Sequence, residues 1–235
     1  EIWAVRDVTF TIEPGESVGV IGRNGSGKTT LLRLIAGIFR PSSGQLEVGG
    51  DVASLLELGA GFHPDFTGRE NVYMNGAIHG LKRKYVDAQM DEIVAFAELE
   101  RFIDVPVRTY SAGMYMRLGF SVAAHLDPDL LLLDEVFAVG DEPFQRKCMN
   151  KVLDLKARGR TLLFVSHSAP AVERLCERAI LLGGGAVLAD GPARDSIADG
   201  HQQRSDVVQH QLHVAVHLAP DVELLLEARD LAREN

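Results

Sequence analysis

A glycine-rich run constrains this chain more than any other feature of its sequence. It consists of Gly22, Arg23, Asn24, Gly25, Ser26, Gly27, Lys28 and Thr29, with Thr30 directly after it. This order fits G-x-x-x-x-G-K-[ST], a loop whose backbone N–H groups cradle phosphates. The apolar run 17–21 before it predicts a buried strand, and the apolar spacing of residues 30–36 after it predicts a helix. A strand, a glycine loop and a helix in this order predict a site for nucleotide phosphates.

The residue types in this run define its expected chemistry. Glycines let the backbone turn its N–H groups toward an anion, and the helix N-terminus adds the positive end of its dipole. We expect Lys28 to reach the β- and γ-phosphates, the Thr29 hydroxyl to ligate Mg²⁺, and Thr30 to join the phosphate contacts. The alternative is a chance glycine-rich turn before a helix, which the flanking pattern disfavours.

A second acidic feature follows a run of four leucines at 130–133. Such a run predicts a strand buried on both faces, which delivers Asp134 to the carboxyl edge of a sheet. There Asp134 is expected to hold Mg²⁺ through water, and Glu135 to orient and deprotonate an attacking water. An ordinary strand that ends in surface acids is the alternative. The phosphate loop upstream favours the catalytic interpretation.

Composition narrows the class of protein. A net charge of -9 over 235 residues argues against a general nucleic-acid binder. Cys148 and Cys176 lack metal-ligand spacing, so free thiols in a reducing cytosol are expected. No apolar run approaches the roughly 20 residues that a membrane span needs. The sequence also begins inside an apparent strand, so we expect further residues upstream.

The remaining pattern predicts one α/β domain over residues 1–200 with a helical subdomain at about 65–125. Helical periodicity covers residues 68–103, and an extension at 201–235 is also expected to be helical. Strands are expected at 2–10, 45–48, 161–165, 179–182 and 186–188. Within the extension, His210, His213 and His217 share one helix face. A polar face is favoured there over a metal site.

These motifs, together with Tyr110-Ser111-Ala112-Gly113-Met114, make the chain resemble the ATP-binding subunits of ABC transporters. The resemblance implies an α/β P-loop NTPase core of the ABC type, with a helical subdomain and an antiparallel β portion. It implies that Ser111, Ala112 and Gly113 of one subunit contact the γ-phosphate held by a second copy. It further implies that Asp141 is the D-loop aspartate, and that His167 is the switch histidine that touches the γ-phosphate.

Three positions depart from the usual family pattern. Glu57 stands where a glutamine normally links Mg²⁺ to the membrane subunit, and we expect it to ligate the metal or its water. Ala112 and Met114 replace the usual Gly and Gln, and backbone contacts survive the first change if φ is negative. Trp3 is the candidate for stacking on adenine, with a place in the core as the alternative.

The segments 55–64, 67–71, 110–118 and 134–141 resemble the polysaccharide-export branch of that family. The resemblance implies an ATPase that powers translocation of a lipid-linked polysaccharide across the cytoplasmic membrane. It implies a homodimer of this chain, two copies of a separate membrane permease, and a peripheral place on the cytoplasmic face of the inner membrane. A C-terminal carbohydrate-binding domain, which some members carry, is either lacking or was removed.

Two other classes of function stay open. The first is a regulatory ATPase of the same type that acts on ribosomes or DNA. One phosphate loop and no heptad run count against it, because such proteins usually carry two ATPase domains or a coiled-coil insertion. The second is a scaffold that binds nucleotide without turnover, and the intact pair Asp134 and Glu135 counts against that.

Overall fold

A computed structural model of the chain describes residues 3–54, 59, 61–78, 81–125, 127–134 and 140–202. These residues form two units, each with its own interior. The sheet unit comprises the described residues within 1–52, 129–135 and 156–235, and the helical unit those within 53–128 and 136–155. Within the described residues, no helix is both long and apolar enough to cross a membrane.

A six-stranded sheet has the order β2-β3-β4-β1-β5-β6. Strands β1, β3, β4 and β5 pair in parallel, and β6 runs antiparallel to β5 at the edge. The strands are β1 (Ser17–Gly22), β2 (Val52–Ser54), β3 (Leu130–Leu133), β4 (Thr161–Ser166), β5 (Arg178–Gly183) and β6 (Ala186–Pro192). This confirms an α/β fold with an antiparallel portion.

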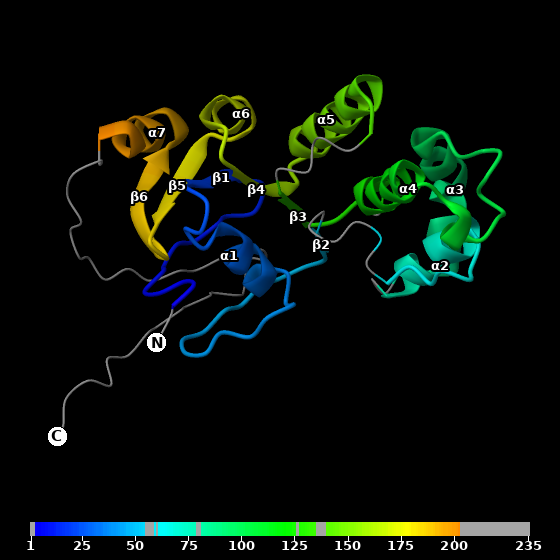
Figure 1. The fold of residues 1–235 in the computed structure, drawn as a ribbon, viewed down its shortest axis with the longest axis horizontal. Coiled ribbons are helices and arrows are strands. Elements are labelled where there is room, and N and C mark those ends of the chain that lie inside the picture. Colours follow the sequence, from blue (N-terminus) through cyan, green and yellow to red (C-terminus); the bar gives the residue numbers. More distant parts are fainter. Residues whose placement is uncertain are drawn as a thin grey trace. The chain divides into compact units, whose positions relative to one another are not determined.

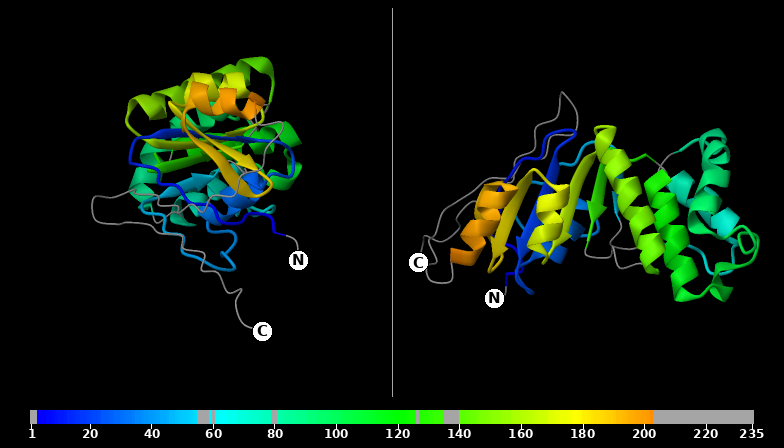
Figure 2. Two further views of the ribbon diagram at one scale, coloured as in Figure 1. Left: turned by 90° about the vertical axis from the view of Figure 1, so that its left-hand side faces the viewer. Right: turned by 90° about the horizontal axis from the view of Figure 1, so that it is seen from above.

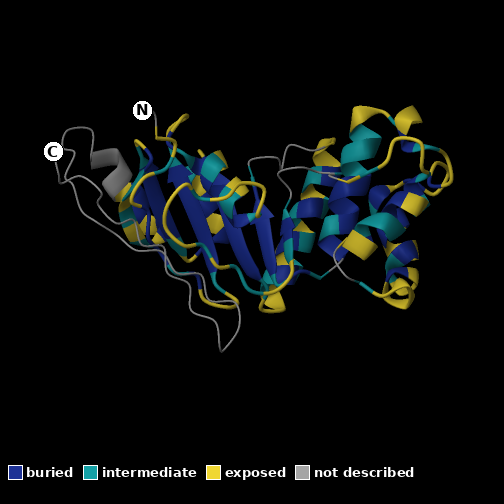
Figure 3. Cartoon of the chain, turned by 90° about the horizontal axis from the view of Figure 1, so that it is seen from below, coloured by how far each residue is buried: buried dark blue, intermediate teal, exposed yellow. Residues whose placement is uncertain are grey.

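Burial explains why the central strands are apolar along their whole length. Every residue of β3 and β4 is buried, and Figure 3 shows the central strands of this sheet in the colour of buried residues. Helix α1 lies on one face of the sheet, with α6 and α7 on the other (Figures 1 and 2). Their bounds are α1 (Lys28–Ile35), α6 (Ala169–Leu175) and α7 (Ala193–Gln202). Helices on both faces therefore exclude water from the strands.

The helical unit holds the segments in which the apolar periodicity predicts helices. Its elements are α2 (Gly68–Ile78), α3 (Arg83–Ala97), the 3-10 turn η1 (Val107–Thr109), α4 (Ala112–His125) and most of α5 (Glu142–Ala157). Val72, Val86, Ile93 and Leu118 are completely buried and belong to one apolar cluster that joins α2, α3 and α4. The predicted domain limits themselves stay a prediction.

Two predicted strands are absent from the described residues. The expected strands at 161–165, 179–182 and 186–188 correspond to β4, β5 and β6, but residues 3–10 and 45–48 carry no strand. Val8 and Phe10 are nevertheless buried. The alternation of apolar residues therefore reports burial of side chains, whereas a strand also needs a neighbouring backbone to pair with. Residues 203–235, with the three histidines of the extension, lie outside the described residues.

Candidate functional site

The glycine-rich run forms the turn from β1 into α1, as the pattern predicts. Gly25 and Gly27 have φ angles of 79° and 101°, in the left-handed region that favours glycine. Gly27 is also the N-cap of α1, and a Cβ there would lie 2.5 Å from the Ala4 carbonyl oxygen. At Gly22 a Cβ would lie 2.3 Å from the Leu182 carbonyl oxygen. The close approach of backbone on two sides therefore requires glycine at both ends of the loop.

Lys28 is buried in the first turn of α1, with only 8% of its surface exposed. Its Nζ donates hydrogen bonds to the carbonyl oxygens of Gly22, at 2.7 Å, and Arg23, at 3.0 Å. The loop thus folds around an ammonium group that it holds through two neutral carbonyls, so a positive charge is kept at the loop. Ser26 Oγ is buried and has no hydrogen-bond partner within the described residues. A buried cation and an unsatisfied hydroxyl in one loop fit a bound phosphate group.

Two further predicted residues follow β3 and β4, strands of the same sheet. Asp134 comes directly after β3, half-buried, and His167 comes directly after β4, exposed. The parallel register pairs Leu133 with Phe164, and Ile21 with Ser166. The carboxyl ends of β3, β4 and β1 therefore share one edge of the sheet, and the structure brings Lys28, Asp134 and His167 to that edge. Ligands of open α/β sheets bind at such an edge.

Trp3 lies in the same unit, next to a segment that touches the loop. Its side chain is 45% exposed, and the Arg6 guanidinium lies 5.9 Å from the centre of its ring. Arg6 N donates to the Gly185 carbonyl at 2.8 Å, while Ala4 approaches Gly27. This exposure counts against a core role for Trp3, and adenine stacking stays a prediction.

The signature residues open helix α4 in the helical unit. Ser111 precedes the helix and acts as its cap, because Ser111 Oγ accepts a hydrogen bond from Met114 N at 3.2 Å. Ser111 and Ala112 are exposed, and a Cβ on Gly113 would meet nothing nearer than 3.9 Å. Ala112 is the first helical residue, so the change from the usual glycine adds no backbone strain. The exposed start of α4 therefore presents backbone N–H groups that could face an anion.

Tyr110, directly before Ser111, is held in place by a hydrogen bond of its side chain. Its hydroxyl donates to the Phe102 carbonyl oxygen at 2.8 Å, and burial raises its pKa to about 12. The phenol therefore stays neutral and keeps its donor at any physiological pH.

Asp141, just before α5, accepts a hydrogen bond from Arg117 Nη2 at 2.8 Å. Sequence reasoning missed Arg117, because nothing in a linear pattern indicates a partner that lies far along the chain.

Glu57 and Glu135 lie outside the described residues, so their roles remain predictions.

The two cysteines are free and buried, and burial raises the pKa of each thiol to about 12. Such thiols are unreactive at neutral pH. No group of three or more metal-ligating residues that could hold an ion is found within the described part of the chain.

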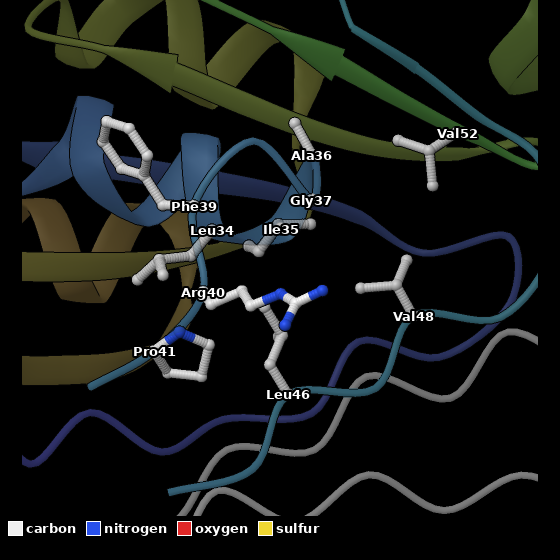
Figure 4. A pocket seen from close by; sticks show the side chains of 10 residues that line it. All are labelled: Leu34, Ile35, Ala36, Gly37, Phe39, Arg40, Pro41, Leu46, Val48 and Val52. Atoms are coloured by element: carbon white, nitrogen blue, oxygen red, sulfur yellow. The ribbon is translucent and has the colours of Figure 1, made fainter. Parts of the chain in front are cut away.

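A groove of about 420 Å³ lies between the end of α1 and the segment that follows it (Figure 4). Leu34, Phe39, Leu46 and Val48 make its lining mainly apolar, and Figure 4 shows the Arg40 side chain among them. Its lining residues come from the C-terminal end of α1 and from residues 36–52, and none comes from the loop that begins the helix. The groove is therefore separate from the phosphate loop.

The chain is similar to proteins of a known family. Residues 5–138 match the ABC transporter family. The chain is 54% identical over 198 residues to the O-antigen export system ATP-binding protein RfbB of Myxococcus xanthus, covering 84% of this chain and 45% of that protein. It is 53% identical over 177 residues to the protein of that name from Klebsiella pneumoniae, covering 75% of this chain and 72% of the relative.

A solved structure shares the fold, and the relatives differ in length. An ATP-binding subunit of an ABC transporter aligns with a TM-score of 0.76 at 25% identity, covering 86% of this chain and 89% of that one. The chain spans less than half the length of its Myxococcus xanthus relative. The phosphate loop, the carboxyl edge of the sheet, the family match and these similarities lead to one conclusion: the chain belongs to the ABC transporter family, in its ATP-binding part.

Proposed function

We propose that this chain binds and hydrolyses ATP and thereby powers an exporter that moves a lipid-linked polysaccharide across the cytoplasmic membrane. The observation that carries the proposal is the buried Lys28 ammonium, held by its own loop at the sheet edge that Asp134 and His167 share. Relatives that are named O-antigen export ATP-binding proteins, at 53% and 54% identity, support the transported class.

The predicted site residues of one copy divide the work at the triphosphate. Loop N–H groups and Lys28 bind the phosphates, and backbone donors pre-oriented by Gly25 and Gly27 need no rearrangement to do so. Thr29 and Asp134, with Glu57, would hold Mg²⁺, which supplies neutralisation of phosphate charge when it is bound. Glu135 orients the attacking water and accepts its proton, and His167 contacts the γ-phosphate.

The second half of each site comes from another copy of the chain. Ser111, Ala112 and Gly113 lie at the N-terminus of α4, the first two exposed, where a γ-phosphate bound by the partner's loop would meet the positive end of the helix. Asp141 would complete that contact. Binding of ATP then favours the paired state, and hydrolysis releases it.

The paired state drives a separate membrane permease, of which two copies are expected by symmetry. The coupling is proposed to run through the segment around Glu57 and the helical unit. This places the chain peripherally, on the cytoplasmic face of the inner membrane.

Turnover and capture test the proposal together. Purified chain should hydrolyse ATP, and Glu135→Gln should bind ATP with unchanged affinity while turnover falls by at least a hundredfold. Tagged wild-type chain from its native cells should recover a multi-span membrane protein. Recovery of ribosomes or nucleic acid would overturn the export function, and wild-type turnover by Glu135→Gln would overturn the assignment of the base.

A further inference from the structure

Arg117 connects three separate elements of the helical unit. It lies on α4, and its side chain is only 21% exposed. One guanidinium nitrogen, Nη2, donates to Asp141 Oδ1 at 2.8 Å, and the other, Nη1, donates to Glu98 Oε2. The same guanidinium lies 4.9 Å from the centre of the Phe144 ring on α5. Contacts on several sides of a planar group fix its orientation.

Glu98, the first partner, is held rigidly where α3 ends. It is the C-cap of α3 and one of the few non-glycine residues with a positive φ, 58°. Its N–H bonds to the Ala95 carbonyl, and its carboxylate also lies 3.4 Å from Lys147 Nζ. Lys147 in turn donates to the Phe96 carbonyl at 2.8 Å. Glu98 thus ends α3 in the left-handed conformation common at helix C-termini, and its carboxylate lies between Arg117 and Lys147.

Asp141, the second partner, stands at the opposite end of this network. Its side chain is 60% exposed, and it follows Gly140, whose φ is 76°. The Asp141 carbonyl accepts a hydrogen bond from Gln145 N at 3.0 Å, so the residue caps the N-terminus of α5. The carboxylate contact with Arg117 therefore links the start of α5 to the helix that Ser111 caps.

We propose that Arg117 is a positioning residue, which fixes Asp141 relative to the Ser111 end of α4 so that both meet the nucleotide on the opposite copy together. The inference rests on the proposed ATPase function, in which Ser111 and Asp141 both serve the partner's site. Arg117 itself touches no nucleotide in this scheme. Its loss should therefore slow turnover without weakening the binding of ATP to the phosphate loop of the same copy.

Steady-state ATP hydrolysis separates these two effects. Arg117→Gln should lower kcat about tenfold, as expected from the loss of a charged hydrogen bond, and leave KM for ATP within about twofold. In a chain that already carries Asp141→Asn, Arg117→Gln should lower kcat by less than about twofold, because the contact is already gone. Arg117→Lys keeps the charge but loses the planar fork, so its kcat should be intermediate.

Arg146→Gln is the matched control. Arg146 forms an ion pair with Glu142 one turn away on α5, and both side chains are largely exposed, at 67% and 79%. Such a pair contributes little to stability, so kcat and KM should match those of the wild type. A fall in kcat for this control equal to that of Arg117→Gln would contradict a specific role for Arg117.

Amide hydrogen exchange gives a reading that needs no hydrolysis. Asp141→Asn should speed exchange in residues 111–116 in the wild-type background, and should add nothing in the Arg117→Gln background. Wild-type kcat and wild-type exchange in Arg117→Gln would overturn the positioning role while the ATPase proposal stands. A wild-type chain without turnover would overturn the ATPase proposal, and the exchange measurement would then decide the positioning role alone.

Discussion

At the scale of single residues, the site depends on one charge that the loop encloses. Lys28 donates to two carbonyls of its own loop, so its ammonium is held in place before any phosphate arrives. Lys28→Ala should therefore weaken ATP binding by roughly ten- to a hundredfold, the value of a charged hydrogen bond. Titration calorimetry with ATP would measure this loss. Lys84→Ala, at an exposed position of α3, is the control and should bind ATP like the wild type.

Gly25 and Gly27 allow the cost of backbone strain to be separated from the cost of a steric clash. Both have positive φ, but a Cβ on Gly25 meets nothing within 4 Å, whereas one on Gly27 lies 2.5 Å from the Ala4 carbonyl oxygen. Gly25→Ala should cost about 1 kcal/mol of unfolding free energy, and Gly27→Ala clearly more, because a backbone segment must also move. Urea unfolding of both variants tests this order. Equal losses would show that the segment at Ala4 yields freely.

Asn71 shows what the sequence could not reveal at this scale. Its side chain is fully buried: Oδ1 accepts a hydrogen bond from His63 N, and the two protons of Nδ2 are shared among the carbonyl oxygens of His63, Phe66 and Thr67. Asn71→Ala leaves His63 N without its acceptor, while the three carbonyls keep their backbone donors, and should destabilise the chain by about 2 kcal/mol. Asn150→Ala, exposed on α5, should change the unfolding free energy by less than about 0.5 kcal/mol. Similar losses for the two variants would contradict this reasoning.

At the scale of elements, periodicity predicted those pieces whose burial is continuous. Strands β1, β3 and β4 are buried along their length and could be placed from their apolar runs alone. The segments 3–10 and 45–48 could not, because pairing depends on a neighbouring backbone that no linear pattern specifies. The phosphate loop was predictable since all its parts are contiguous. The contact between Arg117 and Asp141 was not, because its partners come from different elements.

Helix α4 ends in a buried histidine that makes the folding stability of the chain depend on pH. His125 packs edge-on against Phe96, with ring centroids 5.1 Å apart, and its Nδ1 lies 2.7 Å from the Ser121 carbonyl oxygen. Burial lowers the pKa of His125 below its ordinary value of 6.5. The unfolded chain then binds the proton more readily, so folding stability should fall as the pH drops below about 6.5. This contribution is fully present above that value.

Urea unfolding between pH 5 and 7.5 would measure this dependence. His125→Gln removes the titrating group, so the slope of unfolding free energy against pH should become shallower in this range. Asn150→Ala is a suitable control, because it removes an exposed side chain of α5 that does not titrate and should leave the slope unchanged. A steeper slope in His125→Gln would reverse the sign of the proposed linkage.

At the scale of the whole molecule, the proposed function requires two copies, because Lys28 and Ser111 of one chain serve different nucleotides. In a symmetric pair, a copy with Lys28→Ala still offers its α4 to the partner, and a copy with Ser111→Glu still offers its phosphate loop. Each variant alone should be inactive, since the glutamate repels the γ-phosphate. Mixed in equal amounts, half of the pairs would contain both variants, and each such pair would hold one intact site. The mixture should therefore recover about a quarter of wild-type turnover. A mixture that stays as inactive as its components would mean that each chain completes its own site, and the shared-site mechanism would be wrong.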